Sequence, residues 1–441
     1  MIGYEFEFFA IDAKTKEPIN GKQFDQIHTN LAKKGWVNEI DPISNAINYS
    51  KKGKIALKTD VILHIFELNM PPKETIDEAH EEFMGVLNQV NEEAKRAGVA
   101  LLFIGGLPKK IRYCELTRGN DAIVYTIQLK ETMSDWYTIA GNHIWLDVEK
   151  EELVKTINVY NQLCGIFIAL FGNSSVIEEK IQANIEQRNI HPQRGSKYGF
   201  TFGIPKEPYR KFAQYMKLLI DSKFYFIFDH DGVAFYLNDP KLTYKDYFNG
   251  KNNIEKVNEK RGEKQQELYD IEEISKRNFP EMRPKFIFKK EAKLEKVLNA
   301  IYEENDEKLL NSLERTFLEI RTVPCQRISE IDSPPAFALG IQKNIIKAEK
   351  EIAKKPYGFW AKFRENAIRK GLDFEIDGEN TSEIVIKFLE IAEEGLENKD
   401  KKYLKRTFER VKNRKNLGQE NLGIFEKEGL EKMMEKNLLN Y

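Results

Sequence analysis

Two glutamates two positions apart begin the part of this sequence that could do chemistry. In residues 3–9, Glu5 and Glu7 alternate with aromatic side chains. Because neighbouring side chains of a β-strand point to opposite faces, the segment predicts a strand with both carboxylates on one face. The two charges repel each other unless water or a cation separates them. The pair therefore indicates either half of a metal site or a solvated strand face, and the second arrangement is the commoner one.

Two further segments place an ionisable side chain in a predicted strand. Between residues 61 and 69 the alternation puts Glu67 in an otherwise apolar row, and a buried carboxylate needs a partner. Between residues 141 and 148 it puts His143 on the same face as Trp145. A lone histidine more often has a structural role, so His143 is a candidate ligand only in combination with the carboxylates.

A fourth segment completes this set of strands. Glu319 and Arg321 share one face, opposite Leu318 and Ile320. Alone, Glu-x-Arg can be a surface ion pair that adds little stability. Together, several carboxylates and one histidine suit Mg²⁺ or Mn²⁺, which take oxygen ligands and nucleotide phosphates, and they do not suit a structural zinc site.

Common nucleotide-binding and hydrolase motifs do not occur in the sequence. There is no GxxxxGK[ST] phosphate loop, no GxGxxG dinucleotide turn, no HExxH metal helix and no Gly-x-Ser-x-Gly elbow. If a nucleotide is bound, carboxylate-held metal and arginines must therefore contact its phosphates.

The composition is that of an ordinary globular protein. Of 441 residues, 41% are hydrophobic and 32% charged, and the net charge is -1. This balance excludes a disordered chain and offers no basic field to nucleic acid. The three cysteines are far apart and match neither a disulfide framework nor a zinc–thiolate spacing. No signal peptide is evident at the N-terminus. The longest apolar run, residues 164–171, is shorter than the ~20 residues that span a bilayer. We therefore expect a cytoplasmic protein without a membrane or nucleic-acid partner.

Short strands and helices that could position these side chains alternate in the first part of the chain. We expect strands at 3–11, 61–69, 100–104 and 140–148, the second ended by Pro71 and Pro72. We expect helices at 23–34, 76–97 and 151–170, with Thr75 as the N-cap of the second.

The later part of the chain has mainly helical patterns. Apolar residues recur at helical spacing between residues 289 and 315, which predicts an amphipathic helical pair inserted between two strands. After Pro335 the chain is almost wholly helical in pattern and rich in Lys and Glu, as solvated helix faces are. No repeat or low-complexity linker divides the chain, so we expect one composite domain.

Eight short segments, taken in order, carry a resemblance to a known family. They are residues 2–12, 59–60 with 66–72, 141–145, 161 with 169–175, 188–190, 243–250, 278–285, and 317–321 followed by 333–340. These segments resemble the motifs of the glutamate–cysteine ligases and related carboxylate–amine ligases, which have a glutamine-synthetase-like fold. Each motif is short, but all occur in the family's order over about residues 2–341.

The resemblance implies an α+β fold, in which a glutamine-synthetase-like antiparallel sheet forms the floor of the active site and helices pack against it. We expect a catalytic domain over residues 1–341, with the inserted helical pair at about 289–316, and a helical region over 342–441 packed on the same domain. A homo-oligomer is left open.

The resemblance also implies an enzyme that uses ATP and Mg²⁺ (or Mn²⁺) to join two small molecules, an amino-acid carboxylate and an amine. The bond is an amide made through an acyl phosphate, and glutamate–cysteine ligase activity is the nearest expectation. Arg321 and Arg283 would contact the phosphates, and Asp60 would bind the amine or accept its proton. Arg188 would hold the substrate carboxylate. The resemblance implies that the metal ligands are Glu5, Glu7, Glu67, His143 and Glu319. It also implies contacts to the substrate or ATP from Asn173 and Trp145.

Departures from the family's motifs concern specificity. Trp145 replaces the second His of Gly-x-His-x-His, Pro324 stands where many relatives have Asp, and the inserted helices separate Arg283 from Glu319. They bear on the specificity for the acceptor or the donor, and they indicate an outlying member whose substrates need not be glutamate and cysteine. Two other functions stay open on the same fold: a guanidino-type phosphotransferase, and a catalytically silent relative that binds a nucleotide or an amino acid.

Overall fold

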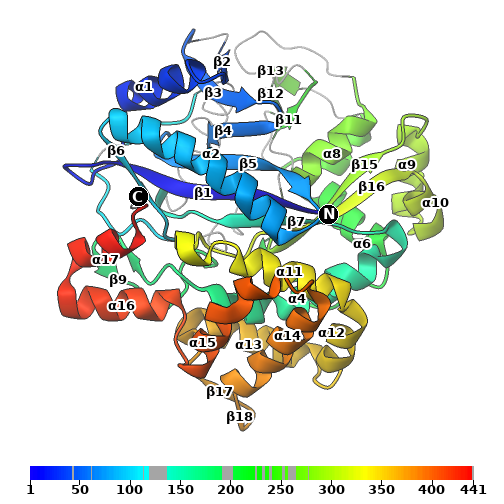
Figure 1. Cartoon of the computed structure of the whole chain (residues 1–441). Helices are drawn as coiled ribbons and strands as arrows, with labels where there is room; N and C mark the ends of the chain where they lie inside the picture. The colour runs from blue at the N-terminus through cyan, green and yellow to red at the C-terminus, as the bar shows by residue number, and fades with distance from the viewer. Residues whose placement is uncertain are drawn as a thin grey trace.

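A nine-stranded sheet is the largest element of the computed structural model, and every pair of its strands is antiparallel. Its strands follow the order β15 (Met282–Phe288), β16 (Leu313–Ile320), β7 (Asn142–Asp147), β1 (Ile2–Asp12), β5 (Ile65–Lys73), β4 (Ile55–Thr59), β3 (Ile47–Lys52) and β2 (Val37–Ile40) (Figure 1). The strand β6 (Val99–Leu102) pairs with the far end of β1. The structure describes residues 1–41, 44–60, 62–112, 114–118, 137–190, 202–223, 226–230, 234–237, 241–250, 254–256, 265–276 and 278–439.

The strand β1 lies at the centre of the sheet, as its alternating sequence requires. It pairs with β5, β6 and β7, and its rings Tyr4, Phe6 and Phe8 are all buried on one face. Glu5 and Glu7 therefore point to the other face. The predicted antiparallel sheet with helices packed against it is confirmed, and the strand that carries the first two carboxylates is its middle.

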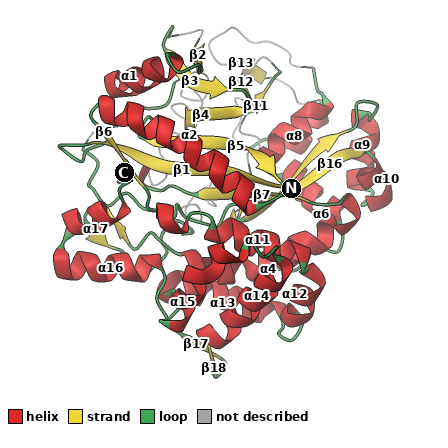
Figure 2. Cartoon of the chain, viewed as in Figure 1, coloured by secondary structure: helices red, strands yellow, loops and turns green. Residues whose placement is uncertain are grey.

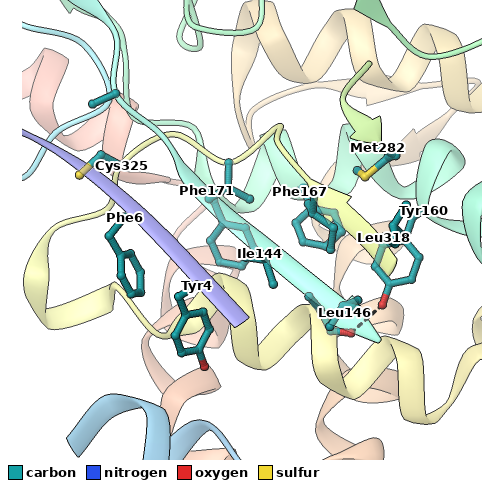
Figure 3. Close-up of a cluster of buried hydrophobic side chains, with 14 of the residues drawn as sticks. Tyr4, Phe6, Ile144, Leu146, Tyr160, Phe167, Phe171, Met282, Leu318 and Cys325 are labelled. Atoms are coloured by element: carbon teal, nitrogen blue, oxygen red, sulfur yellow. Dashed lines mark hydrogen bonds between the residues drawn. The ribbon is translucent and has the colours of Figure 1, made fainter. Parts of the chain in front are cut away.

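Helices α2 (Ile76–Arg96) and α4 (Leu153–Phe171) lie on the apolar face of the sheet. The ring of Phe6 packs 4.2 Å from the ring of Phe83 on α2. Figure 3 shows aromatic side chains of α4 gathered with Ile144, Leu146 and Leu318 of the neighbouring strands. One face of the sheet is thus covered mainly by apolar packing, and Glu5 and Glu7 of β1 point to the opposite face.

The helix α4 also corrects the expectation that the apolar stretches of the chain are too short to span a membrane. Together with the short turn before it, the segment Lys150–Phe171 is long and apolar enough by composition to cross a membrane, although its longest uninterrupted apolar run is short. In its most apolar window, 78% is buried inside the protein. Core helices of soluble proteins pass the same test, so the segment is weak evidence for a membrane span.

Helices follow the predicted positions closely. Thr75 caps α2 by accepting the N–H of Glu78, and α1 (Gly21–Ala32) has a capping box between Asn20 and Gln23. The inserted pair exists as α9 (Leu294–Tyr302) and α10 (Asp306–Asn311), between β15 and β16. The C-terminal helices, which gather on one side of the sheet in Figure 2, are α11 (Ser333–Lys343), α12 (Ile345–Ile352), α13 (Tyr357–Lys370), α14 (Thr381–Gly395), α15 (Lys405–Lys412), α16 (Leu417–Glu428) and α17 (Leu430–Asn437).

Smaller elements fill the region between residues 173 and 280. The helices there are α6 (Phe212–Asp221), α7 (Tyr244–Phe248) and α8 (Leu268–Lys276). A three-stranded sheet joins β11 (Ile227–Phe228), β12 (Ala234–Leu237) and β13 (Ile254–Lys256). Two-stranded pairs are β8 (Val176–Ile177) with β9 (Lys180–Ile181), β10 (Phe202–Gly203) with β14 (Phe279–Pro280), and, later, β17 (Glu375–Ile376) with β18 (Glu379–Asn380).

The second predicted strand is shifted along the chain. We expected it at residues 61–69, whereas β5 spans Ile65–Lys73 and includes both prolines. The register between β1 and β5 shifts at this end of the pair, between Ile2 and Tyr4. Since proline cannot donate a ladder hydrogen bond, an irregular end of this kind tolerates it. Val61 lies outside the described residues.

Candidate active site

The register of the central strands brings the predicted ligands together on the polar face of the sheet. Glu5 lies opposite His143 on one side and opposite Asn69 on the other. Glu7 lies opposite Glu67. The ligand atoms of Glu5, Glu7 and His143 all lie within 4.8 Å of one another, which is close enough for one metal ion. Three of the predicted ligands thus form a compact cluster across β1 and β7.

His143 is neutral, and its hydrogen bonds fix which nitrogen carries the proton. Its Nε2 lies 3.0 Å from Nη2 of Arg188, and a guanidinium can only donate, so Nε2 accepts. The proton is therefore on Nδ1, which donates to Glu5 at 2.7 Å. Burial, and then the charges of Arg321 and Arg188, lower the pKa of His143 well below its usual value. Nε2 thus carries the lone pair, and a metal would use it in place of the contact with Arg188.

The acidic half of the site is electrostatically strained. Burial raises the pKa of Glu7 well above its usual value, and Asp60 adds to this while Arg188 opposes it. Burial and the charge of Glu5 likewise raise the pKa of Glu67, although Lys58 lies 2.8 Å from its Oε1. The pKa of Asp60 is raised to about 7 by burial and by Glu67. Four carboxylates therefore share this side of the site with too few cations.

The other half of the site, on β15 and β16, is rich in cations. Glu319 is completely buried, and Arg283 donates to both of its oxygens at 2.6 and 2.7 Å. Arg321 donates to Oε1 at 2.5 Å, and Lys285 lies 3.9 Å from Oε2. Burial alone would raise the pKa of Glu319, but Arg283, Arg321 and Lys285 outweigh it and hold the pKa well below its usual value.

Glu319 therefore differs from the other predicted ligands. Its oxygens are taken by arginines, although Oε1 lies only 3.8 Å from Nδ1 of His143. In this arrangement its carboxylate orients the guanidinium groups of Arg283 and Arg321. Its role as a metal ligand stays a prediction.

Sequence reasoning missed two lysines of this face. Lys285 is 7% exposed, and its Nζ lies 5.6 Å above the ring of Trp145. Burial, and then Arg283, lower its pKa well below the usual value. Lys58 is paired with Glu67, as described above. The signal for Lys285 was available, because it stands two positions after Arg283 and so shares its strand face.

Arg188 crosses the site from a loop after α4. Besides its contact with His143, it donates to the backbone carbonyl of Arg321, and its Nε has no partner among the described residues. A Cβ at Gly141 would overlap its guanidinium group. The N–H of Gly141 also donates to Glu7, so this glycine lets two site residues approach the same backbone.

Asn173 is used elsewhere. It is completely buried, its Nδ2 donates to the carbonyl of Cys325 at 2.8 Å, and its Oδ1 accepts from Asn421 at 2.7 Å. These bonds tie the end of α4 to the C-terminal helix α16. Its predicted contact with ATP or substrate stays a prediction, and the structure gives its side chain a packing role.

The residues present fit a divalent metal and a polyphosphate. Glu5, Glu7, Glu67 and the Nε2 atom of His143 are hard or borderline donors of the kind that Mg²⁺ and Mn²⁺ take. The raised pKa values of Glu7 and Glu67 show that this half would be relieved by added positive charge. The cations around Glu319 match the phosphate groups that such a metal accompanies.

Comparison with known proteins supports a relationship. Residues 1–180 match the model of the family described as glutamate-cysteine ligase family 2 (GCS2). The chain resembles the glutamate–cysteine ligases. The chloroplastic glutamate–cysteine ligase of Nicotiana tabacum is 25% identical over 266 residues, which are 57% of this chain and 48% of that enzyme. The chain thus spans about half the length of this curated relative.

The fold is shared over a greater length. The crystal structure of a glutamate–cysteine ligase from Francisella tularensis, in complex with AMP, aligns with a TM-score of 0.57 and 12% sequence identity. The alignment covers 99% of this chain and 87% of that enzyme. The resemblance seen in the sequence motifs and the predicted fold class are both confirmed.

Proposed function

We propose that this protein is an ATP- and Mg²⁺-dependent ligase that joins an amino-acid carboxylate to an amine. The observation that carries the proposal is the separation of charge across one sheet face. Carboxylates and a neutral histidine gather on β1, β5 and β7, while Arg283, Lys285 and Arg321 gather around Glu319. A reaction that brings a carboxylate to the γ-phosphate of ATP needs both halves, because two anions must be held together.

The cationic half would hold the phosphates. A bound Mg²⁺ would neutralise phosphate oxygens and polarise the γ-phosphate. Arg321 and Arg283 would donate to the β- and γ-phosphates and to the charge that develops as the substrate carboxylate oxygen attacks phosphorus and ADP leaves. Glu319 keeps both guanidinium groups in place, so little reorganisation is needed during the reaction.

The second step would form the amide. The amine nitrogen attacks the acyl carbon, phosphate leaves, and the nitrogen loses a proton. Asp60, whose pKa is raised to about 7, is suited to bind an ammonium group or accept that proton. Arg188 is placed to hold the carboxylate of the acid substrate. Trp145 and Lys285 line the side of the site where relatives carry a second histidine, so they would shape the acceptor.

Glutamate–cysteine ligase activity is the finer form of the proposal, and the family match and the resemblance of fold support it. A different amine with the same mechanism remains compatible with Trp145. A cytoplasmic location belongs to the same proposal, although the tobacco relative is chloroplastic.

The variant Glu5→Gln tests the proposal. Metal-dependent ADP release, measured with a matrix of amino acids and amines, should fall by at least about 10–100-fold, since even outer residues of metal sites have effects of this size. Without Mg²⁺ the variant should be as stable as the wild type or more so, because one of several crowded carboxylates is gone. With Mg²⁺ the wild type should gain more thermal stability than the variant.

Glu39→Gln is the matched control, because Glu39 pairs with Lys51 at the far edge of the same sheet. It should leave ADP release and the Mg²⁺ effect unchanged. Unaltered turnover in Glu5→Gln would contradict the metal assignment. ADP release that needs only one acceptor would indicate a phosphotransferase, and a product mass lacking an amide would do the same.

A further inference from the structure

Three buried oxygen atoms on the other face of β1 have no hydrogen-bond partner among the described residues. They are the hydroxyl of Tyr4, Oδ1 of Asp332 and Oδ2 of Asp400. Their residues are 3%, 4% and 0% exposed. Because a buried polar atom without a partner destabilises the fold, three such atoms around the start of one helix need an explanation.

The three residues lie around the first turns of α2, and the charges of Asp332 and Asp400 both act on Tyr4. Asp400 accepts the N–H of Asp77 at 3.1 Å, at the start of that helix. Asp332 accepts from His80, one turn further along, at 2.6 Å. Tyr4 lies under the same helix face, since its neighbour Phe6 packs on Phe83, and Figure 3 shows its hydroxyl directed away from the strand.

Electrostatics agrees with this placement. Burial, and then the charges of Asp332 and Asp400, raise the pKa of Tyr4 well above its usual value. The phenol therefore stays protonated and can offer only a neutral oxygen. A cavity of about 280 Å³ reaches Asp332 from the side of His80 and Tyr403, and Lys402 and Arg406 also line it.

Burial is the main influence on the two carboxylates of the cluster. It raises the pKa of Asp332, although His80 donates a hydrogen bond to it. It also raises the pKa of Asp400, although the backbone N–H of Asp77 and the charge of Lys399 oppose this. Lys402 donates to Asp77 at 2.5 Å. Added positive charge beside the two carboxylates would therefore favour their ionised form.

We propose that Tyr4, Asp332 and Asp400 form a site for a monovalent alkali cation, Na⁺ or K⁺. Carboxylate and hydroxyl oxygens are the hard ligands that such ions take, and a positive charge would stabilise the ionised form of the two buried aspartates. The ion would join β1, α2 and the segment before α15 from behind the sheet. The inference is independent of the proposed function, because it concerns the opposite face of β1.

Thermal unfolding with NaCl, KCl or choline chloride at constant ionic strength tests the site. We expect the melting temperature of the wild type to rise saturably, by about 2–4 °C, with one of the alkali salts and not with choline. Tyr4→Phe removes one ligand with little change of shape and should abolish most of this rise. Asp332→Asn should do the same.

Glu5→Gln is the matched control, one position away on the same strand but on the other face. It should keep the alkali effect. If Glu5→Gln abolished the effect and Tyr4→Phe kept it, the ion would lie among the catalytic carboxylates and the proposal would be wrong. Equal melting temperatures in alkali and choline salts would also overturn it, and would show that only a water molecule bridges the three oxygens. An anomalous peak between them in crystals soaked in RbCl would support it directly.

Discussion

The buried glutamates of this site have pKa values shifted in opposite directions because their neighbours differ. Glu7 and Glu67 stand among other carboxylates, and their pKa values are raised by burial and by that crowding. Glu319 stands among three cations, and its pKa is held well below the usual value although it is completely buried. The first kind is suited to receive a metal ion, and the second is suited to hold arginines in fixed positions.

Lys285 allows a prediction at this scale. Replacing it with Met keeps the side-chain volume but removes a cation 3.9 Å from Glu319. Arg283 and Arg321 still satisfy Glu319, so the free energy of unfolding should be unchanged or higher, since burying an ammonium group is costly. If Lys285 contacts a phosphate or a substrate carboxylate, the KM for ATP or for the acid should rise about 10–100-fold.

Steady-state kinetics with each substrate varied in turn measures this effect. Lys289→Met, just beyond the end of β15, is the control and should leave both KM values unchanged. A normal KM for every substrate in Lys285→Met would show that Lys285 serves only to pack against Trp145.

At the scale of elements, local patterns in the sequence predicted those elements that carry their own signals. The alternation in β1 and the Thr75 cap of α2 are such signals, and both elements were confirmed. The strands β2, β3 and β4 were missed because they are short, and β2 and β3 are also polar and partly exposed. The shift of β5 past its prolines depends on how it pairs with β1, which is not a local property.

The site was predictable to the same extent. Alternation identified which side chains of one strand share a face, such as Glu5 with Glu7 and Glu319 with Arg321, and the folded sheet brings His143 of β7 close to Glu5 and Glu7. Alternation did not show that Arg283 and Lys285 would also reach Glu319, because β16 lies between β15 and β7 only in the folded sheet. Partners of this kind come from strand order, which no single segment of the sequence contains.

Gly141 gives a prediction for the element β7 and the turn before it. In Gly141→Ala the new Cβ would overlap the guanidinium of Arg188, so Arg188 must leave its contact with His143. Because the end of an arginine side chain can shift, the loss of stability should be modest, about 1–3 kcal/mol. The loss of activity should be larger, since Arg188 is then displaced from the site.

Denaturant unfolding and the rate of ADP release measure the two effects. Gly85→Ala is the control, because a Cβ at Gly85 in the helix α2 has open space around it. That change should be neutral or stabilising, by about 0.5–1 kcal/mol. Equal activity in Gly141→Ala and wild type would contradict the role given to Arg188.

At the scale of the whole molecule, burial extends beyond the apolar face of the sheet, and two histidines are buried with it. His28 and His64 are 0% and 1% exposed. Burial, and then Arg118, lower the pKa of His28 to about 3, and burial lowers the pKa of His64 to about 4. His28 contacts Ser50 at 2.6 Å, and His64 contacts the carbonyl of Tyr137 at 2.9 Å.

Acid should therefore destabilise the fold through these two residues. In the unfolded chain a histidine has a pKa near 6.5, so its stabilising contribution is complete above that pH and is lost as the pH falls toward 4 or 3. At pH 5 each histidine should have lost about 2 kcal/mol relative to pH 8. The crowded carboxylates act in the opposite direction, because acids with raised pKa values favour the folded state as the pH falls.

Comparison of variants separates the two opposing contributions. The difference in unfolding free energy between pH 8 and pH 5, measured with urea, should change by about 2 kcal/mol in His28→Gln and in His64→Gln, in the direction of greater relative stability at pH 5. His230→Gln, at a histidine whose side chain is 66% exposed, should leave that difference unaltered. If the buried and exposed variants behaved alike, the two histidines would be protonated in the folded protein, and their surroundings would be less completely sealed from water than their burial indicates.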